Sequence, residues 1–202
     1  GTQALAGVGA TSSVQFLVLG FCTGLCSGFG VPVGRDFGAN QFGRMRKDIF
    51  HGALLTAVIA VILTTGCVLL CPWILKMLSV TEDIYGNARI YILIIFLGLP
   101  FTLLYNFLSS ILRAVGDSRT PFLFLAFSAC LNVVLDLICI IVFKWGCAGA
   151  AFATITAQAI SGLCCLIFII KKVQILHPKR KDCHLQPVYV KEMLVMGLPM
   201  GL

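Results

Sequence analysis

Charged residues are scarce in this 202-residue sequence: 11% of the residues are Asp, Glu, Lys or Arg, whereas 59% are hydrophobic. The mean hydropathy is +1.00, which is far from the average of soluble domains. A water-soluble fold of this size has too little core to hide so much apolar surface. The composition therefore excludes an ordinary soluble domain.

Motifs of the common enzyme classes are missing as well. The sequence has no glycine-rich phosphate loop, no paired carboxylates and no nucleophile elbow. Its three histidines, His51, His177 and His184, lie outside the middle of the apolar runs, so no opposed pair is placed to hold a haem. We therefore expect that the protein is not an enzyme and needs no cofactor.

The sequence also lacks an initiator methionine and a signal peptide. Residue 1 is glycine, and no basic segment with a cleavage site follows it. At the other end, residues 188–202 enter a new apolar segment that is cut off. We therefore expect a fragment of a longer protein.

Long apolar runs are what the sequence does contain. Its charges gather in short clusters separated by about twenty apolar residues, enough to cross a hydrocarbon core of roughly 30 Å. This pattern predicts an all-α, polytopic transmembrane helical bundle with five complete spans and the start of a sixth near Val188. Pro100 should kink the third span, because its ring removes a backbone hydrogen bond. The predicted spans are 11–33, 49–75, 84–112, 121–143 and 148–170.

Basic residues alternate between the connections and thereby predict the orientation. Eleven of them lie in or beside the connections after spans one, three and five, whereas only Lys76, Arg89 and Lys144 lie in or beside the others. Because basic residues are retained on the cytoplasmic side, the first set of connections should be cytoplasmic. The eleven are Arg35, Arg44, Arg46, Lys47, Arg113, Arg119, Lys171, Lys172, Lys179, Arg180 and Lys181.

The same residues account for the net charge of +7 without a nucleic-acid partner. They lie next to the spans and lack the interleaved aromatic residues of a single-strand binder. The polar run 177–184 contains two His and one Cys, but it lacks the paired ligand spacings of a zinc module. We therefore expect no nucleic acid as a partner, and a solvated linker at this run.

Small residues are spaced for close helix packing. Gly20, Gly24 and Gly28 follow one another at intervals of four in the first span, and three further glycines, up to Gly38, come next. Close helix contact in lipid depends on such residues, because they let two backbones approach. We expect this glycine face to press against neighbouring helices.

One ionisable group lies well inside a predicted span. Asp136 is in span 121–143, about four residues or roughly 6 Å of rise past its middle, toward the outer end. Every other Asp or Glu lies in a connection or at a margin. Because a charge inside a membrane costs a few kcal/mol, such residues usually face a cavity or a partner and mark function.

Polar residues form three stripes at helical spacing. Ser128, Asn132 and Asp136 project from one face of the fourth span. If the stripes converge, they enclose a water-accessible pocket with a single carboxylate, which can accept a proton or ligate a small cation. The alternative is that Asp136 only hydrogen-bonds helices together. The other stripes are Asn106, Ser109, Ser110 and Arg113 on the third span, and Thr154, Gln158 and Ser161 on the fifth.

Five short motifs occur in an order and spacing that together are specific. They are residues 1–9; residues 28–33 leading to 37–39; residues 113–118 with Pro121; the pair Asn132 and Asp136; and residues 146–151 with 153–154. On these motifs the chain resembles the multidrug and toxic compound extrusion (MATE) family over essentially its whole length. One departure is Arg35-Asp36, where relatives often have Gln. We expect only a local loop change there.

The resemblance implies a multi-pass protein of the cell (plasma) membrane, with twelve helices in two lobes related by pseudo-twofold symmetry. Residues 1–187 would form the first-lobe bundle without its first helix, with an inter-lobe linker at about 171–187. Residues 188–202 would begin the second lobe. The family implies antiport, in which sodium ions or protons flow inward while a cationic or amphipathic organic compound leaves by alternating access.

The resemblance also assigns roles to residues. In family members a carboxylate on the first helix works with an Asn and an Asp on the fifth helix and a Thr on the sixth. The last three match Asn132, Asp136 and Thr154, which implies a coupling site for Na⁺ or a proton. We add Asn106 to this site, and we assign Ser128, Gln158, Ser161 and Ser109 to the substrate pathway.

Two other functions stay open. The resemblance extends to flippases and exporters of lipid-linked oligosaccharide or polysaccharide precursors, whose anionic cargo would favour several basic residues along a central cavity. The only basic residues counted with the spans are Arg89 and Arg113, and both lie near the ends of the third span. A purely structural or channel-forming membrane subunit would need no coupling acid.

Overall fold

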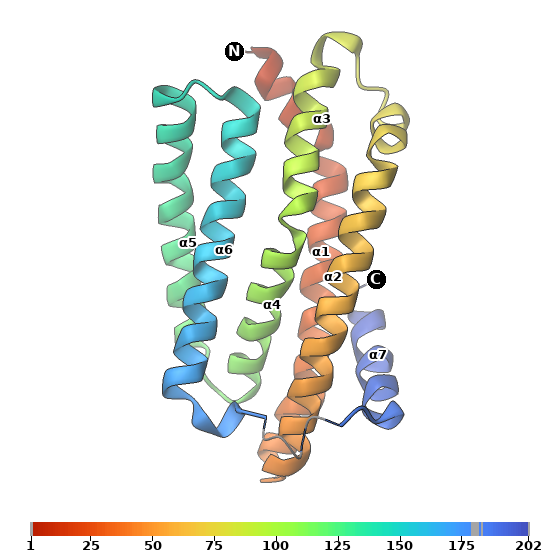
Figure 1. Ribbon diagram of the computed structural model, residues 1–202, viewed down its shortest axis with the longest axis vertical. Helices are drawn as coiled ribbons and strands as arrows, with labels where there is room; N and C mark the ends of the chain where they lie inside the picture. The colour runs from red at the N-terminus through yellow and green to blue at the C-terminus, as the bar shows by residue number, and fades with distance from the viewer. Residues whose placement is uncertain (1, 179–181, 183, 202) are drawn as a thin grey trace.

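A computed structural model of the chain describes residues 2–178, 182 and 184–201 (Figure 1). The described residues form a bundle of long antiparallel helices with no strand among them. This confirms the predicted all-α bundle. The helices are α1 (Thr2–Gly38), α2 (Phe42–Met77), α3 (Glu82–Leu97), α4 (Leu99–Ala114), α5 (Arg119–Leu137), α6 (Gly146–Lys172) and α7 (Pro187–Gly201), with a π-helical turn at Ile138–Val142 and a 3-10 turn at Gln174–Leu176.

Five stretches of the bundle are suited to crossing a bilayer. Four helices are long and apolar enough by themselves: the Thr11–Gly38 part of α1, then α2, α5 with its π-helical turn, and α6. The bent pair α3 and α4 makes a fifth when it is counted as one span. Large apolar side chains such as Phe16, Leu69 and Phe122 are exposed on the outside, as expected of a surface that faces lipid. The five predicted complete spans are therefore confirmed.

The third span is broken where the sequence predicts a kink. α3 ends at Leu97, α4 begins at Leu99 with Pro100 in its first turn, and the two helices are bent by 43°. Pro100 has no backbone N–H to donate, and its ring disfavours helix at the residue before it. At the break, a Cβ atom on Gly98 would lie 2.4 Å from the Ile155 side chain of α6. The glycine therefore lets α6 pack directly against the bend.

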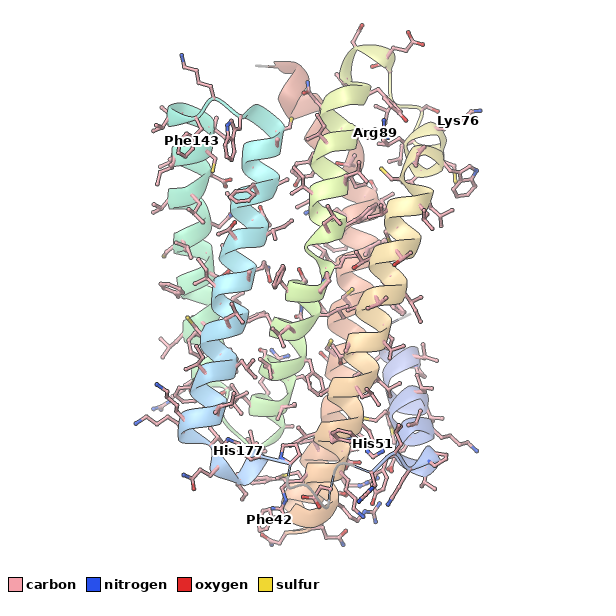
Figure 2. The ribbon with its side chains drawn as sticks, in the orientation of Figure 1. Phe42, His51, Lys76, Arg89, Phe143 and His177 are labelled. Carbon is pink, nitrogen blue, oxygen red and sulfur yellow. The ribbon has the colours of Figure 1, made fainter. Side chains whose placement is uncertain are left out.

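Basic residues gather at one end of the bundle, which we call the basic end. It holds the α1–α2, α4–α5 and α6–α7 connections. Figure 2 shows Phe42 and His177 at this end, and Lys76 and Arg89 at the opposite end. Eight of the eleven residues predicted to be cytoplasmic belong to the connections and helix margins of the basic end, and the other three, residues 179–181, lie outside the described residues. We expect the basic end to face the cytoplasm.

The prediction of a loop change at Arg35-Asp36 is wrong. α1 continues to Gly38, so both residues lie inside the helix, and the Asp36 side chain is buried. The helix ends only where Asn40 adopts a φ of +56°, a left-handed conformation that asparagine tolerates and that commonly follows a helix end. Arg35 and Asp36 therefore project from a rigid helix into the basic end.

The polar run 177–184 is less solvated than predicted. Asp182 is buried and accepts a hydrogen bond from Arg46 Nε at 3.1 Å. His177 Nε2 lies 3.1 Å from the Ile169 carbonyl oxygen, so this residue is tied back to α6. Residues 179–181 and 183 of the run lie outside the described residues. The ion pair between Arg46 and Asp182 is the physical reason for the burial, because it compensates the Asp182 charge.

Helices α1 and α7 meet through glycines on both sides. A Cβ atom on Gly24 would lie 2.0 Å from the Met200 carbonyl oxygen, and one on Gly28 would lie 2.5 Å from the Gly197 Cα atom. α7 repeats the four-residue spacing with Gly197 and Gly201. This arrangement corresponds to the small-residue packing by which helices approach closely in lipid.

The predicted packing of the whole glycine face is nevertheless wrong for Gly20 and Gly38. A Cβ atom on either of these residues would have no heavy atom within 4 Å among the described neighbours.

Substituting Gly28 by valine should force α1 and α7 apart. The new side chain would meet α7 backbone, and overpacking of this kind costs about 1–3 kcal/mol. The thermal unfolding midpoint of the protein purified in detergent should therefore fall. Gly66→Val is the control, because Gly66 lies in the middle of α2 and a Cβ atom there would have no heavy atom within 4 Å among the described residues. Equal destabilisation by both variants would contradict the packing described here.

The turn between α4 and α5 sets where α5 begins. Gly116 adopts a φ of +88°, a conformation that favours glycine. Asp117 Oδ1 then accepts a hydrogen bond from the Thr120 backbone N–H at 3.0 Å and so caps the first turn of α5. Two hydrogen bonds from Thr120 lower the pKa of Asp117. The bond from the Thr120 side chain contributes most, and the bond from its backbone N–H contributes less.

Asp117→Ala should destabilise the protein by about 1 kcal/mol at neutral pH, since it removes this cap. Because the pKa of Asp117 is lowered in the folded state, its stabilisation is present above the unfolded-state pKa of about 3.9. It is lost as the pH falls through the folded-state value. The unfolding midpoints of wild type and variant should therefore converge in strong acid. A difference that stays constant from neutral to strongly acidic pH would exclude the carboxylate as the cap.

Candidate functional site

Two of the predicted coupling residues contact each other across α5 and α6. Asn132 Nδ2 of α5 donates a hydrogen bond to Thr154 Oγ1 of α6 at 3.2 Å. Thr154 Oγ1 in turn donates to the Ala150 carbonyl oxygen at 2.9 Å. The hydroxyl hydrogen is thereby directed to the backbone, and the hydroxyl oxygen is free to accept from the amide. The Asn132 side chain also carries a carbonyl oxygen, a neutral ligand of the kind that hard cations bind.

A polar hollow of about 180 Å³ lies between the same two helices. It is lined by four predicted site residues, Ser128 and Asn132 from α5 and Thr154 and Gln158 from α6, together with Leu125, Ala129 and Ala157. The stripes predicted on the fourth and fifth spans therefore converge. The helix spacing explains this result, because residues three and four apart share one face.

The third stripe lines a second hollow, of about 360 Å³, next to the first. Asn106 and Ser109 of α4 face it, as does Arg113 one turn further. Thr23 of α1 completes the wall, with its Oγ1 atom 3.5 Å from Asn106 Oδ1. Leu125 lines both hollows, so the two polar spaces are separated by this apolar side chain.

Asp136 lies one turn beyond Asn132 along α5 and is partly buried. Its Oδ1 atom is shielded from solvent and has no hydrogen-bond partner among the described residues. Tyr91 of α3 is within electrostatic range of this carboxyl group. The Tyr91 hydroxyl donates a hydrogen bond to Gln15 Oε1 of α1 at 3.1 Å. One oxygen of the carboxyl group is therefore left for a proton, a cation or a donor that approaches from outside this part of the chain.

A π-helical turn follows Asp136 almost directly. From Ile138 to Val142 the helix widens to hydrogen bonds between residues five apart, and the Phe143 N–H donates to the Ile138 carbonyl at 3.1 Å. Single π-helical turns are frequent at functional sites. A Cβ atom on Gly149 of α6 would lie 3.0 Å from the Cys139 Cβ atom inside this turn. The glycine therefore keeps α6 close to the widened segment.

The structure does not bring all the predicted residues together. Asp136 lines neither hollow, and among the described residues it makes no hydrogen bond to Asn132 or Thr154. Ser161 is buried, its hydroxyl has no described partner, and it lies outside both hollows as well. The assigned residues therefore fall into three places: the Asn132 hollow, the Asn106 hollow, and the carboxyl group of Asp136 one turn beyond Asn132.

Three polar residues of this region escaped the sequence analysis. Gln15, Thr23 and Ser27 lie eight and four residues apart on α1, so they share one helix face and form a fourth stripe. The glycines of α1 drew attention to its packing face instead. Tyr91 carried a weaker signal, namely a hydroxyl group inside an apolar run that needs a partner when it is buried.

Comparisons with known proteins agree with this fold. The MatE family model matches residues 1–138 of the chain. The probable multidrug resistance protein YpnP of Bacillus subtilis (strain 168) is 34% identical over 171 residues, which cover 85% of this chain and 38% of that relative. The chain therefore spans less than half the length of this relative.

Two solved structures share the fold. They are an inward-facing and an outward-facing conformation of a multidrug resistance MATE family transporter of the MOP superfamily. Each superposes on 100% of this chain with a TM-score of 0.93 at 23% identity, and the chain covers 46% and 45% of those chains. The family model covers well over half of the sequence, and the bundle of apolar spans has the same fold. The chain therefore belongs to the MatE family of integral membrane proteins.

Proposed function

We propose that this chain is part of a cation-coupled antiporter that exports drugs or other amphipathic organic compounds by alternating access. The observation that carries the proposal is Asp136, a carboxyl group inside a membrane span with one oxygen shielded from water and no described donor. An acid in this position is costly unless it binds a proton or a cation. The proposal gains support from the relative named as a multidrug resistance protein.

The coupling step depends on a difference in charge: Asp136 carries a carboxylate, whereas its neighbours Asn132 and Thr154 are neutral. A proton on Asp136 removes the buried charge, whereas a sodium ion balances it and takes oxygen ligands from Asn132 and Thr154. The second route requires α5 and α6 to shift, because Asp136 lies one turn from those ligands. Either event changes which arrangement of α5, α6 and α3 is favoured, since an ion shifts an equilibrium only by binding one state better.

The substrate pathway in this proposal runs along the two polar hollows. Ser128 and Gln158 line the first, Ser109 lines the second, and Asn106 lies beside Thr23 of α1. We place Ser161 behind this wall as a packing residue. Residues 1–187 act as one lobe, and residues 188–202 begin the partner lobe that closes the pathway.

A second candidate function is the movement of a lipid-linked saccharide precursor. Arg113 supports it, because this cation lines the hollow shared with Asn106 and Ser109 and is placed to meet an anionic headgroup. Arg113→Gln separates the two candidates: it should leave export of cationic dyes intact in an exporter but abolish transport of a pyrophosphate-linked lipid in a flippase.

Asp136→Asn should abolish ion-dependent export. The amide keeps the shape of the carboxyl group, but it cannot take up a proton and carries no charge to hold sodium. Export is measured as ethidium efflux from cells that make the full-length gene product, with an imposed proton or sodium gradient. Asp83→Asn is the control, because Asp83 is an exposed acid in the first turn of α3. Undiminished, still ion-dependent efflux in the Asp136→Asn variant would defeat the proposal.

Asn132→Ala and Thr154→Ala should have milder effects than Asp136→Asn. Each removes one ligand or hydrogen bond worth about 1–2 kcal/mol but leaves the charge, which corresponds to roughly 5–30-fold weaker ion binding. The ion concentration that gives half-maximal efflux should rise by that factor. Thr154→Ser keeps the hydroxyl and should stay near wild type. A Thr154→Ser variant as impaired as Thr154→Ala would show that the methyl packing matters and the oxygen does not.

A further inference from the structure

Five charged side chains from three helices meet at the basic end. They are Arg35 and Asp36 of α1, Arg44 and Asp48 of α2, and Glu192 of α7. Asp36 is 2% exposed and Asp48 is 0% exposed, so both carboxyl groups are shielded from water. Asp36 and Asp48 are twelve positions apart in the sequence, so they form no short sequence motif. The turn between α1 and α2 brings the two acids together.

The two arginines join the three helices. Arg35 Nε donates to Asp36 Oδ1 at 2.9 Å, and Arg44 Nε lies 3.3 Å from Asp36 Oδ2. A terminal nitrogen of Arg35 also donates to Glu192 Oε1. Arg35 therefore links α1 to α7, and Arg44 links α1 to α2.

No arginine among the described residues forms a salt bridge with Asp48. Both of its oxygens are shielded from solvent and lack a donor among the described residues. The charged groups that face it are Asp36 and Arg35 from α1 and Glu192 from α7, and Asp36 is close enough for a side-chain hydrogen bond. Asp36 Oδ2 also lacks a hydrogen bond. Two carboxyl groups thus face each other with no proton donor between them, an arrangement in which both do not ionise together.

The charges of the cluster balance only when one carboxyl group is protonated. Three acids and two arginines leave one negative charge in excess, and a buried unpaired charge costs several kcal/mol. A proton on Asp48 removes the excess and supplies the donor that Asp36 Oδ2 lacks. A metal ion fits less well, because within the described part of the chain no three acidic, His or Cys groups are placed to ligate one.

We propose that Asp36 and Asp48 form a proton-binding site distinct from Asp136, whose occupancy sets how firmly α7 docks on α1 and α2. The proton lies on Asp48 and is donated to Asp36. When it leaves, the new negative charge faces Glu192 and weakens the contact of α7 with α1. Asp136 lies about 25 Å of helical rise along α5 from the basic end, so the two sites are separate. The proposal goes beyond the export function and does not depend on it.

Neutral contacts also hold the start of α7, and they do not involve this proton. The Gln186 N–H donates to His51 Nε2 at 3.0 Å, and the His51 ring stacks on Tyr189 with centroids 5.2 Å apart. His51 Nδ1 lies 2.7 Å from the Lys47 carbonyl oxygen and donates to it, while Nε2 is the acceptor for Gln186. Loss of the proton should therefore loosen α7 and not release it.

Infrared spectroscopy tests the proton directly, because a protonated carboxyl group has its own C=O stretching band. All variants carry Asp136→Asn in the full-length gene product, so that the coupling acid adds no band. Asp48→Asn should remove the band of one carboxylic acid. Asp36→Asn should remove it too, because the new amide donates to Asp48 in place of the proton. Asp83→Asn is the control, because Asp83 is an exposed acid at the opposite end of the bundle, and this variant should keep the band.

Hydrogen exchange of the α7 backbone amides tests the effect on docking. At each pH the exchange of residues 187–192 is compared with that of the Asp48→Asn variant, which mimics the protonated state at every pH. Above the pH at which the band disappears, exchange without the Asp48 substitution should become faster by up to about tenfold per pH unit relative to the variant. Glu192→Gln should exchange faster at every pH, since it weakens the link to Arg35.

Three results would overturn the proposal. The first is a carboxylic acid band that survives both Asp48→Asn and Asp36→Asn. The second is α7 exchange that follows pH identically with and without Asp48→Asn. The third is exchange that responds to sodium at fixed pH but not to pH, which would place a metal ion where we place the proton.

Discussion

A carboxyl group inside a membrane bundle must find a proton, a cation or a hydrogen-bond donor, because water is not there to solvate it. Most of what distinguishes this chain follows from that constraint. Arginines compensate the charges of Asp182 and Asp36. In our proposal a proton neutralises Asp48. Asp136 has neither an arginine nor a described donor at its shielded oxygen. In our proposal it is the acid whose charge a mobile ion neutralises.

The helices hold this acid one turn from neutral oxygens and give its shielded oxygen no hydrogen-bond donor among the described residues. The cap at Asp117 fixes where α5 starts, and the π-helical turn at Ile138–Val142 changes its pitch just past Asp136. Gly98 and Gly149 let α6 approach the bent third span and the π-helical turn. The result is a polar hollow beside Asn132 and a carboxyl group one turn away along α5. A short movement along α5 and α6 is all that separates the acid from its proposed ligands.

Sequence reasoning predicted the features that depend on local pattern. The lengths of the hydrophobic runs predicted the spans, and Pro100 predicted the break in the third span. The four-residue spacing predicted that Asn132 shares a polar helix face, and this face lines the same hollow as Thr154. Features that depend on which helices meet were not predictable in this way. Arg35 and Asp36 looked like part of a turn because charge usually ends a span, yet ion pairs to α2 and α7 keep them inside the helix.

The surroundings of Asp136 also depend on helix arrangement, since Tyr91, which is within electrostatic range of it, comes from a distant part of the chain. The measurement that bears most directly on ion coupling is carbon NMR of the Asp136 side-chain carboxyl in the full-length gene product. Its resonance should shift on addition of protons or sodium, and a transported cation should reverse that shift by displacing the ion. A resonance that responds to neither ion, or that responds but ignores the substrate, would contradict coupling at this residue.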